Sequence, residues 1–128
     1  MSIKNSSVNN NFKDESVMKE VQDNLEFKII SGELAAGDKF PPIRDLAEMY
    51  NIGTSTAQKI VNNLSAEDVI MKKRGVGFFV KPFVKGKLMD KHVADCKRRF
   101  KVDIDYAVKL GLDSQAIVAE LLKGEKEE

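Results

Sequence analysis

Several polar side chains between positions 54 and 62 are of the types that hydrogen-bond to nucleic acids. They are Thr54, Ser55, Thr56, Gln58, Lys59 and Asn62. Hydroxyl groups bond phosphates and base edges, while Gln and Asn can pair bidentately with adenine and Lys can reach guanine. The same residues would also suit a helix that is capped by hydroxyl groups and exposes a solvated face. The elements that surround them must decide between these two interpretations.

The apolar residues around this segment predict two short amphipathic helices joined by a tight turn. The first helix is expected from about residue 43 to 50 and the second from about 54 to 68. The inner stripe of the second helix consists of Ala57, Ile60, Val61 and Leu64, at helical spacing. In this motif the second helix enters the DNA major groove and the first crosses the phosphate backbone. Arg44 would then contact a phosphate, unless it pairs with Asp45 or Glu48.

A basic hairpin is predicted directly after the second helix. Its strands are expected at about 69–71 and 78–81, and glycines at its tip permit a positive φ. The residues that could approach the minor groove closely are Lys72, Lys73, Arg74 and Gly75. A run of charge alone is more often a solvated face. The position of this run after the second helix favours DNA contact, so helix, turn, helix and hairpin together predict a DNA-binding device.

The charge of the chain is almost balanced, with 21 Lys and Arg against 20 Asp and Glu and a net charge of +1. No acidic residue lies between Lys72 and Lys87, however, and a local field rather than the net charge steers a polyanion. The single Cys96 cannot form an intrachain disulfide, which fits a reducing cytoplasm. No apolar run approaches transmembrane length. We therefore expect a cytoplasmic protein that has no membrane partner.

The chain is expected to consist of a tail, a DNA-binding domain and a helical appendage. Residues 1–11 are rich in Asn and Ser and predict a disordered tail. A helix should begin near Ser16 and end at Gly32. A winged helix-turn-helix domain would thus occupy residues 12–82 and the appendage residues 83–128.

Two helices are predicted in the appendage, and each carries an apolar stripe. The residues of these stripes are Leu88, Val93, Cys96, Phe100, Ile104, Val108, Ile117 and Leu121. So short a segment cannot bury both stripes by itself, which suggests docking onto a second copy of the chain. The sequence therefore predicts a homodimer.

No constellation of residues points to catalysis. His92 and Cys96 are spaced i,i+4 and are metal-ligand types, but two ligands do not close a site unless a dimer supplies four. The alternative is a core cysteine with a surface histidine. The chain also lacks a His-Glu-x-x-His sequence and a phosphate loop of P-loop spacing. We expect neither an enzyme nor a cofactor or metal site.

Short sequence pieces, taken in order and at their spacing, resemble the GntR family of bacterial transcription repressors. The pieces are Ile30-Ser31-Gly32-Glu33-Leu34, Gly37-Asp38-Lys39-Phe40-Pro41, Arg44-Asp45-Leu46-Ala47, Leu64-Ser65-Ala66-Glu67 and Gly75-Val76-Gly77-Phe78-Phe79-Val80. The short tail, with Ala107 to Asp113, looks like the YtrA subfamily, in which two helices replace a large effector domain. The resemblance covers roughly residues 12–123 and implies a homodimeric regulator on an inverted-repeat operator.

The chain departs from the family pattern at positions that would contact DNA. Where the family usually has Ser-Glu-Arg before its second helix, this chain has Pro42-Ile43-Arg44, so only Arg44 inherits the contact role. A common arginine of the recognition helix is Gln58, and a basic residue between the hairpin glycines is Val76. These departures put the family's operator sequence in doubt for this chain but leave the docking mode intact.

Together these observations predict an α+β, mostly helical fold: a winged helix-turn-helix domain with a two-helix dimerisation segment. The expected function is sequence-specific binding of double-stranded DNA by a homodimeric transcription regulator, a repressor by resemblance. A sequence-tolerant DNA-packaging protein and a protein-interaction module that has lost DNA binding remain alternatives. A small-molecule effector is left open, because no residue pattern identifies one.

Overall fold

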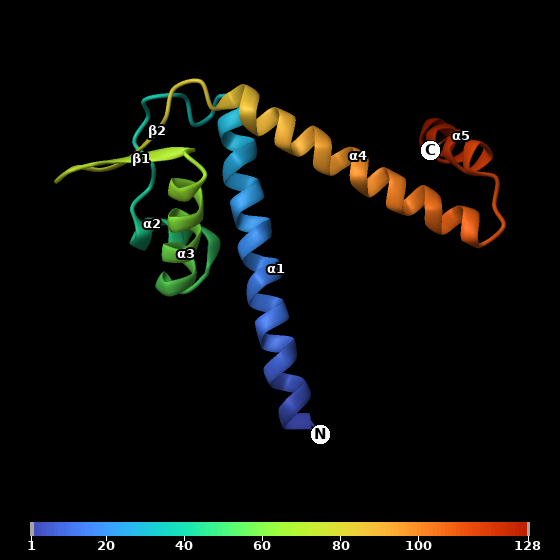
Figure 1. The fold of residues 1–128 in the computed structure, drawn as a ribbon, viewed down its shortest axis with the longest axis horizontal. Helices are drawn as coiled ribbons and strands as arrows, with labels where there is room; N and C mark the ends of the chain where they lie inside the picture. The colour runs from blue at the N-terminus through green and yellow to red at the C-terminus, as the bar shows by residue number, and fades with distance from the viewer. Residues whose placement is uncertain (1, 128) are drawn as a thin grey trace. The chain divides into compact units, whose positions relative to one another are not determined.

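The computed structural model describes the backbone of residues 2–127 and the side chains of residues 15–124. Five helices and one hairpin follow one another along this part of the chain (Figure 1). They are α1 Ser2–Ser31, α2 Ile43–Tyr50, α3 Thr54–Ala66, β1 Ile70–Lys73, β2 Gly77–Val80, α4 Lys85–Lys109 and α5 Ser114–Glu127. The chain divides into a first unit that ends at Met89 and a second that begins at Asp90. The two units are described separately.

Helix α1 begins at Ser2, well before Ser16, where the sequence predicts its start. The expected disordered tail of residues 1–11 is therefore helical from Ser2 on. The packed part of α1 carries an apolar stripe at helical spacing, because Val21, Leu25 and Ile29 are all buried. Once packing has nucleated a helix, each further residue adds a hydrogen bond at little cost. That difference between nucleation and propagation explains why the helix continues through a polar segment with no apolar stripe.

The core of the first unit lies between α1, α2 and α3 (Figure 1). All four residues of the predicted inner stripe of α3 are buried, as are Leu46 and Ala47 of α2. The turn between α2 and α3 is made by Asn51, whose φ of 52° lies in the left-handed region. Asparagine tolerates this conformation better than most residues. The predicted helix-turn-helix is confirmed.

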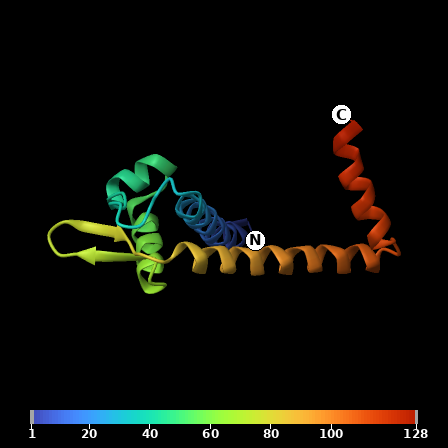
Figure 2. The ribbon, with the colours of Figure 1, turned by 90° about the horizontal axis from the view of Figure 1, so that it is seen from above.

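The hairpin is antiparallel, with Ile70 opposite Val80 and Lys73 opposite Gly77. The loop of residues 37–40 lies along the free edge of β2, where Phe40 N donates to Phe78 O at 2.7 Å and Val80 N donates to Asp38 O at 3.0 Å. Figure 2 shows the hairpin projecting beyond α2 and α3. The loop therefore fixes the base of the hairpin to the core while its tip extends into solvent.

The core of the first unit continues past residue 82, where the sequence places the end of the DNA-binding domain. Val84 is 6% exposed and Leu88, on the first turns of α4, is 1% exposed, and both belong to this core. This burial corrects the assignment of Leu88 to the dimerisation stripe. A side chain that is enclosed within its own chain has almost no surface left for a second copy.

The second unit contains the greater part of α4 and all of α5. Asp113 caps α5, because its carboxylate accepts from the N–H groups of Gln115 at 3.0 Å and Ala116 at 3.3 Å. A hollow of about 170 Å³ lies between the two helices. It is lined by Phe100, Asp103, Ile104, Ala107, Ser114, Ile117, Val118 and Leu121. None of the helices in the described part of the chain has the length and apolar character needed to cross a membrane.

Candidate nucleic-acid interface

The outer face of α3 presents the polar side chains that the sequence singles out. Ser55, Gln58, Lys59 and Asn62 are exposed, and the opposite face of the helix is packed into the core. Gln58 Nε2 donates to Asn62 Oδ1 at 2.9 Å. Thr54 is also exposed, whereas Thr56 is half-buried. The helix thus offers a hydrogen-bonding surface to the solvent, with Thr56 at its margin.

The beginning of α3 is not capped by a hydroxyl group. The N-cap residue is Gly53, which is extended at φ −70° and ψ 157° and makes no side-chain capping bond. The first N–H groups of a helix lack partners within the helix and, with the helix dipole, favour an anion such as phosphate. The N-cap position is therefore not filled by Thr54, Ser55 or Thr56, which disfavours the interpretation of these residues as simple helix caps. The beginning of α3 is instead suited to bind an anion such as phosphate.

Arg44 lies in the first turn of α2 and is exposed. Within the part of the chain whose side chains are described, no ion pair joins Arg44 to Asp45 or Glu48. The alternative that Arg44 is engaged by its own helix is not what the structure shows. Its guanidinium group can reach a phosphate without first breaking such a pair.

The hairpin carries its predicted basic residues on the surface. Lys72, Lys73, Arg74 and Gly75 are all exposed, and Gly75 has a φ of +76°. Lys73 Nζ lies 4.3 Å from the centre of the Phe79 ring. A cation–π contact holds the ammonium group in place while keeping its charge. The hairpin therefore carries exposed cations at Lys72 and Arg74 and one, Lys73, that is stacked on the Phe79 ring.

The structure adds Lys39 to this basic surface, which sequence reasoning did not single out. Lys39 forms an antiparallel bridge with Phe79 and is exposed. Its Cε lies 3.4 Å from where a Cβ on Gly77 would stand, so it runs beside the hairpin. Pairing between residues about forty positions apart leaves no local pattern. The order and spacing of the sequence pieces around Lys39 indicate the fold and not this contact.

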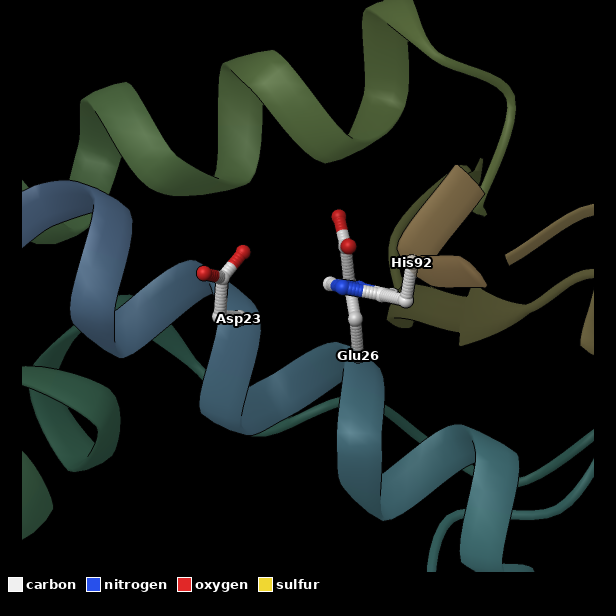
Figure 3. Close-up of side chains that lie close together, drawn as sticks. All are labelled: Asp23, Glu26 and His92. Atoms are coloured by element: carbon white, nitrogen blue, oxygen red, sulfur yellow. The ribbon is translucent and has the colours of Figure 1, made fainter. Parts of the chain in front are cut away.

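A polar network fixes the inner side of α3 to α1. Gln22 Nε2 donates to Glu26 Oε2 at 3.2 Å and to Glu67 Oε2 at 3.3 Å, and Gln22 Oε1 accepts from Asn63 Nδ2 at 3.4 Å. Glu26 is fully buried, and Figure 3 shows it projecting from α1 one turn after Asp23. Buried polar groups that are hydrogen-bonded hold one arrangement of the elements around them. The network therefore sets the position of α3 on α1.

Replacing Gln22 with leucine is expected to lower the free energy of unfolding by about 1–3 kcal/mol. The apolar side chain preserves most of the volume but removes the donor shared by Glu26 and Glu67. Urea denaturation followed by circular dichroism measures the change. Glu20→Ala, at an exposed position of the same helix, is the control and should alter stability little. Equal stability of Gln22→Leu and the unsubstituted protein would contradict the positioning role.

The predicted dimerisation residues of the second unit are largely accessible. Phe100 is 65% exposed and Leu121 is 68% exposed, whereas Ile117 is half-buried. Val93, Ile104, Val108 and Cys96 are exposed as well. The exposure of Cys96 corrects the alternative in which it is a core cysteine, because α4 at this position has no packed face over the thiol. A large apolar surface on a small helical unit is typical of an interaction site.

Part of the chain matches a known protein family. Residues 18–80 match the family described as "Bacterial regulatory proteins, gntR family". The transcriptional regulator YhcF of Bacillus subtilis (strain 168), described as HTH-type, is 25% identical over 61 residues, which cover 48% of this chain and 50% of YhcF. The chain thus matches about half the length of that curated relative.

Solved structures share the fold over most of the chain. A GntR family transcriptional regulator from Listeria monocytogenes has a TM-score of 0.70 at 24% identity, over 84% of this chain and 93% of that one. A transcriptional regulator from Oenococcus oeni has a TM-score of 0.60 at 25% identity, over 83% and 90% of the two chains. The predicted mostly helical winged helix-turn-helix fold is confirmed, and the relatives are described as regulators rather than enzymes, as expected. The match of residues 18–80 shows that the chain carries a helix-turn-helix domain of the GntR family of bacterial regulatory proteins.

Proposed function

We propose that the protein is a sequence-specific DNA-binding transcription regulator that acts as a homodimeric repressor on an inverted-repeat operator. The observation that supports it most is the exposure, within one GntR-type domain, of the polar face of α3, Arg44 and the basic hairpin. These are the surfaces with which a winged helix-turn-helix docks on DNA. Its place of action would be the cytoplasm, and its partner double-stranded DNA.

Each element has its own task in this docking. α3 enters the major groove, where Gln58, Lys59 and Asn62 face the base edges, and the N–H groups at its beginning meet a phosphate. Arg44 on α2 holds the phosphate backbone. Lys72 and Arg74 attract the hairpin to the phosphates that border the minor groove, and Gly75 at the tip allows the backbone to approach the groove closely. Thr54 and Ser55 bond phosphate or base edges at the entry of the helix.

The second unit is proposed as the dimerisation segment. The apolar residues exposed on α4 and α5 would be covered by the same residues of a second copy, in the two-fold arrangement common to homodimers. Two recognition helices related by a two-fold axis read half-sites about one DNA turn, roughly 34 Å, apart. This arrangement agrees with the YtrA-like resemblance.

The salt dependence of binding tests the electrostatic part of the proposal. If each subunit makes about three to five phosphate contacts, log K is expected to fall against log salt with a slope of about −5 to −9. Fluorescence anisotropy of a labelled operator at four or five salt concentrations measures this slope. A slope near zero would rule out docking through Arg44 and the hairpin.

A sequence-tolerant DNA-packaging role is the second candidate, and the replacement of a family arginine by Gln58 favours it. Selection of bound sequences from a random DNA pool separates the two. An enriched inverted repeat supports the regulator. Retention of DNA with a specific-to-nonspecific ratio well below about 10³ supports packaging, and no retention at low salt supports an interaction module without DNA binding.

A further inference from the structure

The hydrogen bond between Gln58 and Asn62 is the one link between two exposed side chains on the outer face of α3 that the structure records. We propose that these two amides read DNA as a coupled pair, in which Gln58 selects adenine and Asn62 positions the Gln58 amide for it. The proposal rests on the proposed function, since it names a base that α3 reads.

The stereochemistry of an amide allows Gln58 to bond Asn62 and adenine at once. Bidentate recognition of adenine uses the amide oxygen, which accepts from N6, and the N–H on the same side, which donates to N7. The second N–H of the same nitrogen points away from adenine. That N–H can serve the bond from Gln58 Nε2 to Asn62 Oδ1, at 2.9 Å. The bond therefore fixes the plane of the Gln58 amide without using its adenine-reading edge.

The same bond does not fix what Asn62 itself reads. A side-chain carbonyl oxygen has two lone pairs, so Asn62 Oδ1 can accept from Gln58 and still face a base. Its part in the pair is therefore to hold the Gln58 amide.

The helix holds this pair in a fixed place relative to the DNA. Ala57, Ile60 and Val61 are buried on the opposite face, and the network of Gln22 anchors the same helix to α1. The helix therefore presents the Gln58 amide from one position, and the predicted site contains an adenine opposite Gln58.

The test compares unsubstituted protein, Gln58→Ala, Asn62→Ala and the double variant on a selected operator and on every single-base change at the adenine that Gln58 reads. Competition binding gives a preference for each base. For the unsubstituted protein we expect about tenfold preference for adenine. Asn62→Ala should lower this preference at least about threefold, although alanine at 62 leaves Gln58 itself in place. Gln58→Ala should remove the preference, and adding Asn62→Ala to it should change the preference no further.

A matched control comes from Lys59, an exposed neighbour that takes no part in the bond. Lys59→Ala should weaken binding while leaving the adenine preference of the pair unchanged. Because all three side chains are exposed, circular dichroism should show the same fold for every variant. If Asn62→Ala leaves the adenine preference intact, or if the single effects simply multiply in the double variant, the coupled pair is wrong. If the unsubstituted protein enriches no motif, the sequence-specific function itself has failed.

Discussion

Arg44→Ala is expected to weaken operator binding by about two to four orders of magnitude at fixed salt. A hydrogen bond to a charged group contributes about 1.5–3 kcal/mol, and a homodimer loses this contact twice. Each 1.4 kcal/mol corresponds to about tenfold in affinity. The large effect follows from the position of Arg44, which is exposed in the first turn of α2 and is not ion-paired with Asp45 or Glu48 among the described side chains. Fluorescence anisotropy with a labelled operator measures the change.

Two further variants serve as controls for Arg44→Ala. Arg44→Lys keeps the charge but loses the planar fork that binds phosphate bidentately, so its affinity should fall between those of alanine and arginine. Arg98→Ala removes a matched, exposed arginine from the second unit, where it pairs with Asp95, and should change binding little. Affinity of Arg44→Ala within about threefold of the unsubstituted protein would show that α2 does not hold the backbone.

The sequence predicts the helix-turn-helix well because its signals are local. Buried residues at helical spacing mark α3, and the four predicted inner residues are all enclosed. Asn51 stands where a left-handed residue must reverse the chain. Exposed positions follow by elimination, which is why Arg44, Gln58 and Asn62 are accessible as expected. Local periodicity and turn chemistry are enough for elements of this kind.

Other features depend on contacts that no local pattern records. Leu88 fits an apolar stripe equally well whether its partner is the core of its own chain or a second copy, and only the fold shows the former. The sequence predicts that α1 begins near Ser16, just before the buried apolar stripe, although a helix can extend into polar sequence without such a stripe. Lys39 reaches the hairpin through a long-range bridge. By contrast, the bond between Gln58 and Asn62 could be predicted from the sequence, because residues four apart on a helix are neighbours.

Placing aspartate at both Phe100 and Leu121 is expected to convert the proposed dimer to a monomer and to weaken operator binding by about 10²–10⁴-fold. Both side chains line the hollow between α4 and α5 and are more than half exposed. Each therefore has apolar surface that a second copy of the chain can bury. A charge that is buried without a partner at such an interface costs several kcal/mol. Once the two domains are no longer linked, each must bind its half-site alone.

Sedimentation equilibrium measures the mass, and anisotropy on one and two half-sites measures the binding. The variant should keep the unfolding transition of the first unit, because neither residue belongs to its core, and should bind one half-site as the unsubstituted domain does. Lys97→Asp places the same carboxylate on an exposed polar position of α4 and should leave the dimer intact. A double aspartate variant that remains dimeric with full operator affinity would move the dimer interface away from α4 and α5, because exposed apolar residues that tolerate buried charge cannot be what holds two copies together.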